Sequence, residues 1–302
     1  MVVVLAFIAN ILVAIAKSVA AAITGSASLV AEAAHSWADA GNEVFLLVAD
    51  KRSVRASDDE HPLGYGREAY VWSLLAAVGV FTVGAVVSVM HGVQELFDPE
   101  PASDFGIAYA VLGVSALLEG ASLLQSVIQA RRTAAKYERD AVDYVVNGSD
   151  ATLRGVVAED SAALAGLAIA FLGILLHQVT GNPAYDSIGS ILIGLLLAGV
   201  AIILINQNRR YLVGLNPPEK FRVSAGRRLL ASPGIVRVTY LHLEFVGPGR
   251  LFLVAAVDLA GNDAEELVAE RIRNIEREIE KDELIQQAVL TLSVADEPSL
   301  AF

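Results

Sequence analysis

Six apolar stretches, each about 20 residues long, occupy the chain up to about residue 206. They lie near residues 2–24, 29–50, 70–94, 104–128, 154–177 and 186–206. About 20 apolar residues let an α-helix cross the hydrocarbon core of a bilayer, whereas membrane-spanning β-strands would alternate apolar and polar residues. The sequence therefore predicts a membrane protein built on an all-α bundle of six transmembrane helices.

The composition agrees with this class and excludes others. Of the 302 residues 55% are hydrophobic and 19% are charged, whereas soluble domains usually hold about 45–50% apolar residues. There is no cysteine, so disulfides, thiolate nucleophiles and Cys-type zinc sites are excluded. The net charge of −12 argues against nucleic acid as a partner.

The charged residues of the loops predict the orientation in the membrane. Lys and Arg gather in alternate connections: Lys51, Arg52, Arg55 and Arg67 in 51–67, then Arg131, Arg132, Lys136, Arg139 and Arg154 in 129–154, then Arg209 and Arg210. The other loops, 25–28, 95–103 and 178–185, contain neither. The positive-inside rule places the basic loops and both ends of the chain in the cytoplasm. We expect an integral protein of a bacterial inner membrane, with a short cytoplasmic leader upstream of Met1.

The pattern changes after the last span, which divides the chain into a transmembrane domain, 1–210, and a cytosolic domain, 211–302. Helical patterns at 216–232 and 263–280 alternate with strand patterns at 235–245, 250–260 and 286–294, and "VGPG" at 246–249 is typical of a turn. The order α-β-β-α-β predicts a small ferredoxin-like α+β domain. A unit of this size is better suited to docking or dimerisation than to independent catalysis.

The second span carries polar residues that a bilayer does not favour. Glu32, His35, Asp39 and Asn42 follow the spacing i, i+3, i+7, i+10, which places them on one helical face. An acid at the bilayer centre costs at least about 2.5–3.5 kcal/mol, so such residues are candidates for function. The i, i+4 pair of His35 and Asp39 can present an imidazole nitrogen and a carboxylate to one ion.

Glu159 and Asp160 form a second acidic patch in the fifth span. With the first patch they would give one nitrogen and several oxygens, a ligand set that suits Zn²⁺, with Mn²⁺ gaining as carboxylates predominate. Neighbouring residues point about 100° apart on a helix, so Glu159 could instead lie on the far side of Asp160. Glu119 is a further buried acid. It is either a proton carrier or the partner of Lys17, and we favour the partner.

Several segments together resemble the cation diffusion facilitator family. They are "GSASLVAEAAHSWADAGNE", "HPLGYGREAYVWS", "EDSAALAGLAIA" and "DSIGSILIGLLLAG", followed by a cytosolic domain with "GPGRLFL". The resemblance covers nearly the whole chain. It implies a homodimeric exporter of divalent metal, usually Zn²⁺, in exchange for protons, with a dimer contact through the cytosolic domain.

The resemblance also implies a ligand set, with one departure. Family members typically carry His-x-x-x-Asp in both the second and the fifth span. His35 and Asp39 match the first pair and Asp160 matches the acid of the second, but Val156 stands where the second histidine would be. Glu159 or a water then completes the shell, or three protein ligands suffice. We therefore expect the metal to bind among His35, Asp39, Asp160 and Glu159.

The loop "DDEHPLGYGR", residues 58–67, matches a second ion site of some family members only in part. Asp58 and His61 match, but Tyr65 stands at the position of the second histidine. Pro62, Gly64 and Gly66 are typical turn residues. We favour a turn that caps the third span over a second ion site.

These observations predict proton-coupled efflux of divalent cations by alternating access. Bound metal requires neutral imidazole and ionised carboxylates, so metal and protons compete. We expect Zn²⁺ as the transported substrate, with Mn²⁺, Fe²⁺ and Co²⁺ as the other candidates, and no fixed cofactor. The alternatives are an intramembrane metal-dependent enzyme, which the lack of an H-E-x-x-H motif disfavours, and a sensor or structural membrane protein stabilised by metal.

Overall fold

The computed structural model describes residues 2–99, 104–136 and 140–302. Arg139, one of the basic residues of the 129–154 connection, lies outside them. The chain forms two compact units: residues up to 50 with 70–209, and residues 51–69 with 210–302. The segment that follows the second span therefore groups with the C-terminal part of the chain.

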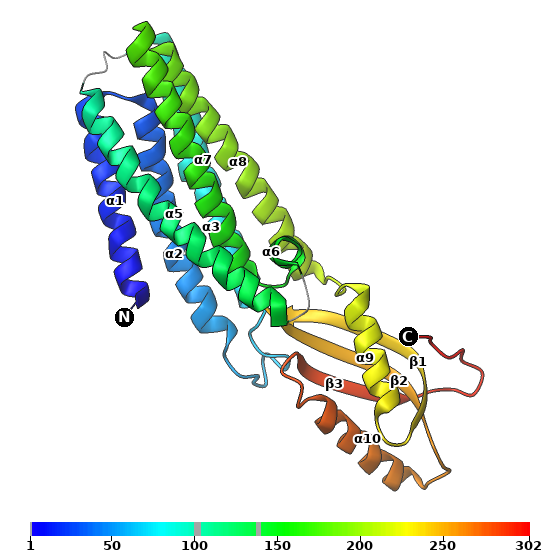
Figure 1. Cartoon of the computed structure of the whole chain (residues 1–302). Helices are drawn as coiled ribbons and strands as arrows, with labels where there is room; N and C mark the ends of the chain where they lie inside the picture. Colours follow the sequence, from blue (N-terminus) through cyan, green and yellow to red (C-terminus); the bar gives the residue numbers. More distant parts are fainter. Residues whose placement is uncertain (1, 100–103, 137–139) are drawn as a thin grey trace. The chain divides into compact units, whose positions relative to one another are not determined.

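The first unit is a bundle of long helices (Figure 1). Its elements, with the helix ends that continue into the second unit, are α1 (Val2–Thr24), α2 (Ala27–Ser53), α3 (Glu68–Gly79), the π-helical segment η1 (Val80–Val86), α4 (Val87–Phe97), α5 (Phe105–Lys136), α6 (Ala141–Asn147), α7 (Ala151–Thr180) and α8 (Ala184–Val213). The six-helix bundle predicted from the sequence is confirmed, with α3, η1 and α4 forming one continuous span. The short helix α6, capped by the Asp140 side chain, was not predicted.

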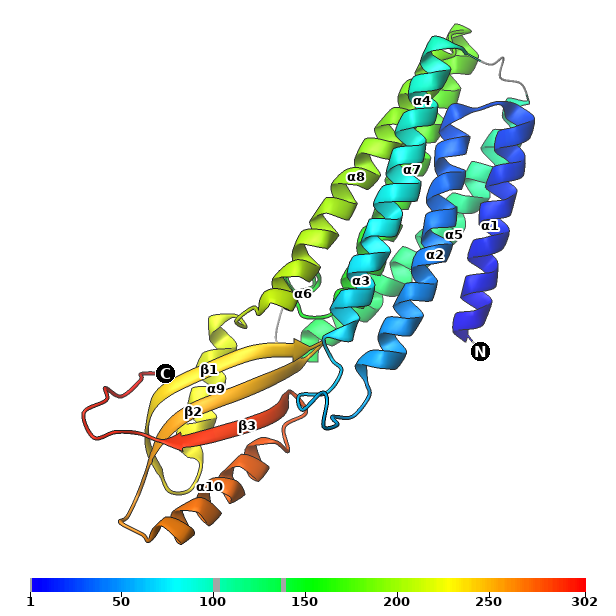
Figure 2. The same cartoon turned by 180° about the vertical axis from the view of Figure 1, so that it is seen from behind.

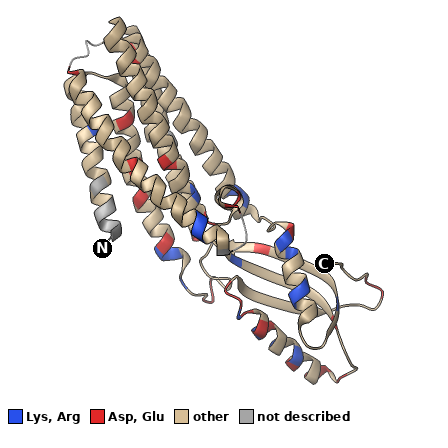
Figure 3. Cartoon of the chain, in the orientation of Figure 1, with Lys and Arg blue, Asp and Glu red and all other residues tan. Residues whose placement is uncertain are grey.

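Hydropathy differs among the six spans. Over the described residues, four helical stretches are long and apolar enough to cross a membrane: Glu68–Phe97, Phe105–Ala135, Ala151–Thr180 and Ala184–Val213. The sequence of α1 is apolar along its length, with Lys17 as its one charged residue, and α2 carries the polar residues discussed above. Figure 3 shows acidic residues within the helices of this bundle.

Close contacts fix α2 between α7 and α8. The Ser28 hydroxyl donates to the Asp186 carbonyl oxygen at 2.8 Å, and the Ser28 amide donates to the Asp186 carboxylate at 3.2 Å. Glycines make this approach possible: a Cβ on Gly189 would lie 2.5 Å from the Ser28 hydroxyl oxygen, and one on Gly173 would lie 3.1 Å from it. Small residues of this kind let membrane helices pack closely, and here they set how α2 and α7 face each other.

The second unit has the predicted ferredoxin-like order. Its sheet runs β1-β2-β3, with β1 (Ile235–Gly247) antiparallel to β2 (Arg250–Leu259), which is parallel to β3 (Ile285–Leu292). Helices α9 (Glu219–Ala231) and α10 (Glu265–Ile279) pack on one face of the sheet (Figure 2). The αββαβ prediction is confirmed.

The segment 51–69, which includes the loop between α2 and α3, packs on β1 within this unit. A Cβ on Gly66 would lie 2.5 Å from the Val246 carbonyl oxygen and 2.8 Å from the Gly247 Cα, so the two backbones touch. Next to it, Arg67 forms an ion pair with Glu244. The loop is therefore held by backbone contact as well as by charge.

Candidate metal site in the helical bundle

The polar residues of α2 lie on its buried side, as their spacing predicted. Glu32, His35 and Asn42 are 0%, 1% and 3% exposed, and Asp39 is partly buried. His35 Nε2 lies 3.4 Å from an Asp39 carboxylate oxygen. One turn of α2 thus brings an imidazole and a carboxylate together.

Lys17 pairs with Glu32, which corrects the partner favoured from the sequence, Glu119. Lys17 Nζ on α1 donates to the Glu32 carboxylate at 2.9 Å, and both side chains are fully buried. The other Glu32 oxygen faces α7, where a Cβ on Gly166 would lie 2.5 Å from it. Helices α1, α2 and α7 therefore meet around one buried ion pair.

Glu159 and Asp160 are neighbours on α7 but form hydrogen bonds with different helices. Glu159 accepts a hydrogen bond from the Asn42 amide on α2. Asp160 accepts one from the Ser122 hydroxyl on α5 at 2.9 Å. The sequence left open which acid approaches α2, and in this structure Glu159 makes the direct bond.

A cavity of about 380 Å³ lies among α1, α2, α5 and α7. The candidate residues Asp39, Glu159 and Asp160 line it, while His35 is not among its lining residues. Asn10, Glu43 and Gln125 also line it, and they lie nearer than Asp39 to the helix ends that carry the basic loops. The cavity thus extends from the acidic cluster toward that end of the bundle.

The candidate residues do not form a complete metal-binding cluster. In the described part of the chain, no three His, Asp or Glu side chains are grouped so that they could hold a metal ion. Several buried atoms at the site make no hydrogen bond: both His35 ring nitrogens, Asp39 Oδ1 and Asn42 Oδ1. Buried polar atoms are nearly always hydrogen-bonded, so this site has hydrogen-bonding groups that the described residues leave unused.

Two partners of the acids were not assigned from the sequence. Asn42 shares the helical face of His35 and Asp39, so its spacing carried the signal although no role followed from it. Ser122 gave no signal, because a serine in an apolar span is more often a packing residue.

The loop 58–67 forms the predicted turn around Asp58. The Tyr65 hydroxyl donates to one Asp58 oxygen at 2.6 Å, and the His61 backbone amide donates to the other at 2.8 Å. The Arg55 guanidinium lies over the Tyr65 ring, 4.1 Å from its centroid. The bond from Tyr65 holds the pKa of the Asp58 carboxyl below its ordinary value. Both oxygens of Asp58 thus serve the turn.

Replacing Tyr65 by phenylalanine should raise the pKa of Asp58 toward its ordinary value. A carboxyl whose pKa is lowered by folding stabilises the fold above its unfolded-state pKa, and this stabilisation is lost as the pH falls through the folded pKa. The variant should therefore melt below the parent at neutral pH, and this difference should vanish in strong acid. Tyr185→Phe, at an exposed tyrosine of α8, is the control. A Tyr65→Phe deficit that is independent of pH would contradict this prediction.

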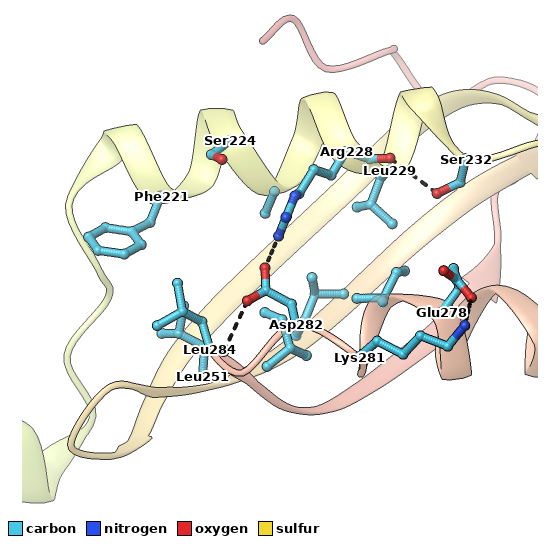
Figure 4. Close-up of a pocket in the computed structure, with 14 residues that line it drawn as sticks. Phe221, Ser224, Arg228, Leu229, Ser232, Leu251, Glu278, Lys281, Asp282 and Leu284 are labelled. Atoms are coloured by element: carbon cyan, nitrogen blue, oxygen red, sulfur yellow. Dashed lines mark hydrogen bonds and ion pairs between the residues drawn. The ribbon is translucent and has the colours of Figure 1, made fainter. Parts of the chain in front are cut away.

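A second cavity, of about 400 Å³, lies between α9 and the segment joining α10 to β3 (Figure 4). Its lining is largely apolar, including Leu229 and Leu253 of the core. The charged groups at its rim neutralise each other, because Arg228 pairs with Asp282 and Lys281 pairs with Glu278. This cavity offers no converging ligands for an ion.

Comparison with known proteins gives one family model and several relatives. The model of the cation efflux transmembrane domain matches residues 3–213. Metal tolerance protein C4 of Arabidopsis thaliana is 40% identical over 234 residues, 77% of this chain and 51% of the relative. The mitochondrial proton-coupled zinc antiporter SLC30A9 of Homo sapiens is 35% identical over 240 residues, 79% of this chain and 42% of the relative.

An uncharacterised transporter of Methanocaldococcus jannaschii is 23% identical over 293 residues, which is 97% of each chain. This match reaches into the C-terminal unit. By contrast, the aligned part of the chain spans about half the length, or less, of the plant and human relatives.

Proposed function

Because the chain belongs to the cation diffusion facilitator family, we propose that it carries divalent metal cations across a membrane as a secondary transporter rather than as an enzyme. The cavity lined by Asp39, Glu159 and Asp160 inside an apolar bundle supports this most directly. Carboxylates within a membrane are costly unless a partner compensates them, and they typically mark an ion pathway.

We assign the ion to His35, Asp39 and Glu159, with Asp160 as the fourth candidate. This set offers one imidazole nitrogen and carboxylate oxygens from α2 and α7, which suits Zn²⁺ first and Mn²⁺, Fe²⁺ or Co²⁺ next. A relative named as a zinc antiporter is consistent with this order. Because these groups do not form a complete cluster here, binding would draw the side chains of the two helices together around the ion.

Proton coupling follows from the chemistry of the same ligands. A metal ion needs the His35 ring neutral and the carboxylates ionised, so binding releases protons and protonation releases the ion. If the site faces each side of the membrane in turn, a proton gradient then drives metal movement. The name of the human relative includes proton coupling, in agreement with this mechanism.

The direction of transport is inferred from where the cavity lies. Its lining runs from Asp39 toward the basic ends of the helices, which the positive-inside rule assigns to the cytoplasm. On the other side of Asp39 lie the Lys17–Glu32 pair and the close contacts of Ser28. We therefore propose loading from the cytoplasm and efflux across the membrane, with both termini cytoplasmic and a bacterial inner membrane as the location.

Proteoliposome uptake tests the proposed function. The purified chain is reconstituted and offered Zn²⁺, Mn²⁺, Fe²⁺ and Co²⁺ with and without a pH gradient, beside Asp39→Ala. We expect uptake of at least one ion that increases with the gradient and is lost in the variant. Uptake that is equal with and without the pH gradient would refute proton coupling. Absence of uptake for every ion would refute transport.

We also propose a homodimer that forms through the sheet face opposite α9 and α10. Tyr240 on this face is 53% exposed, and Phe252, Val254 and Val289 elsewhere on the same face are half-buried. An exposed apolar patch of this kind is typical of a protein contact. The chain contains no cysteine, so Tyr240→Cys gives a single thiol; oxidation should yield a covalent dimer, and a monomer at every concentration would contradict the proposal.

A further inference from the structure

Asn42 joins the two helices that carry the candidate ligands. It follows Asp39 by three residues and His35 by seven on α2, it is 3% exposed, and it lines the cavity beside Asp39. Its amide nitrogen donates to the carboxylate of Glu159 on α7. The rotamer of Glu159 is thus tied to a residue on the opposite helix.

The chemistry of the two groups fixes how the amide is turned. The amide nitrogen can only donate, and it faces a Glu159 carboxylate oxygen, which accepts. The amide oxygen, Oδ1, then points elsewhere. It is buried and has no hydrogen-bond donor among the described residues.

Other atoms on the same face of α2 also lack hydrogen bonds, and most of them can donate an electron pair. Asp39 Oδ1 is buried without a hydrogen bond, and so are the two His35 ring nitrogens, although Nε2 lies 3.4 Å from the other Asp39 oxygen; one ring nitrogen is an acceptor in the neutral ring. Acceptors of this kind are the groups that a bound cation would need, once the side chains close around it. We propose that Asn42 selects among metal ions, with its amide nitrogen orienting Glu159 and its amide oxygen serving as a ligand, an inference that rests on the proposed transport function.

An amide oxygen changes which ion fits best without changing the charge of the site. It is a hard, neutral ligand, and hard oxygen ligands favour ions such as Mn²⁺, which accept more than four ligands. One imidazole with carboxylates alone can satisfy tetrahedral Zn²⁺. Asn42 therefore improves binding of Mn²⁺ more than binding of Zn²⁺.

Calorimetric titration of the purified full chain with Zn²⁺ and with Mn²⁺ tests this assignment. Asn42→Leu removes both polar groups at similar volume. We expect the Zn²⁺ affinity to fall about tenfold and the Mn²⁺ affinity about 100-fold, the two ends of the range for loss of a group that supports a metal site. Asn42→Asp keeps an oxygen in place and should shift the preference toward Mn²⁺.

Asn10→Leu is the matched control. Asn10 also lines the cavity and donates its amide to a carboxylate, that of Glu43, at 3.0 Å, but it lies on α1, which carries none of the candidate ligands. Its replacement should leave the ratio of the Zn²⁺ and Mn²⁺ affinities unchanged. A merely structural role for Asn42 would lower the melting temperature without moving that ratio.

The possible results distinguish failure of this inference from failure of the proposed transport function. If the parent binds neither ion and takes up none in proteoliposomes, the proposed function fails. If the parent transports while Asn42→Leu keeps the parental ratio of affinities, the assignment of Asn42 is overturned. Should Asn42→Leu not fold, the isosteric Asn42→Asp decides: a shift toward Mn²⁺ supports the assignment and an unchanged preference overturns it.

Discussion

Replacing Glu159 by glutamine is expected to weaken metal binding about 100-fold and to remove measurable uptake, whereas Asp160→Asn should cost only about tenfold. The two acids are neighbours in sequence, but Glu159 bonds to Asn42 on α2 and Asp160 bonds to Ser122 on α5. Glu159 is therefore the carboxylate tied to the helix of His35 and Asp39. As a proposed ligand, Glu159 would lose its charge-assisted bond to the ion, whereas the hydrogen bond from Ser122 holds Asp160 toward α5 and lowers its expected contribution.

The two substitutions form a matched pair. Each replaces a carboxylate by an amide of nearly the same shape, and each retains an oxygen that can accept the existing hydrogen bond from Asn42 or Ser122. Binding affinity is measured by calorimetry and uptake in proteoliposomes, with melting temperature as the check on folding. A larger loss for Asp160→Asn would contradict the prediction and would make Asp160 the principal acid of α7.

The architecture could be predicted from the sequence because its signals are local. The length of each apolar stretch predicted six helices, and the strand patterns after residue 234 predicted the αββαβ order; both are confirmed. The interruption of the third span by η1 (Val80–Val86) was not predicted, because the segment contains no proline and its one threonine and one glycine are common in membrane helices.

The arrangement of the site could be predicted only in part. The i, i+4 spacing correctly placed His35 beside Asp39. The rotation of α7 about its axis, which decides between Glu159 and Asp160, depends on contacts such as that of Gly166 with Glu32. Those contacts join residues far apart in the chain, so no periodicity within α7 could reveal them. The assignment of the metal ligands themselves stays a prediction.

The partner of Lys17 shows the same limit. Glu32 and Glu119 both lie in apolar helices, and sequence spacing does not give the distance from α1 to either of them. The structure pairs Lys17 with Glu32 at 2.9 Å, which leaves Glu119 to line the cavity. Tertiary packing therefore decides which buried acid pairs with the lysine and which one faces the cavity.

Lys17→Met is expected to destabilise the fold by about 3–5 kcal/mol, the usual cost of removing one partner of a buried ion pair. Lys17 and Glu32 are both 0% exposed, so the substitution would leave the Glu32 carboxylate without its counter-ion in an apolar interior. One oxygen of Glu32 already lacks a hydrogen bond, so little else can compensate the charge. Glu32→Gln should destabilise similarly by isolating the ammonium group.

The double variant Lys17→Met with Glu32→Gln should recover most of the loss, because neutral groups of similar volume often replace a buried pair at little cost. Lys51→Met, at an exposed lysine of α2, is the control and should stay within about 0.5 kcal/mol of the parent. Denaturation in detergent micelles measures all four. A Lys17→Met protein as stable as the parent would contradict the prediction. If the double variant is stable but does not transport, the pair serves transport as well as folding.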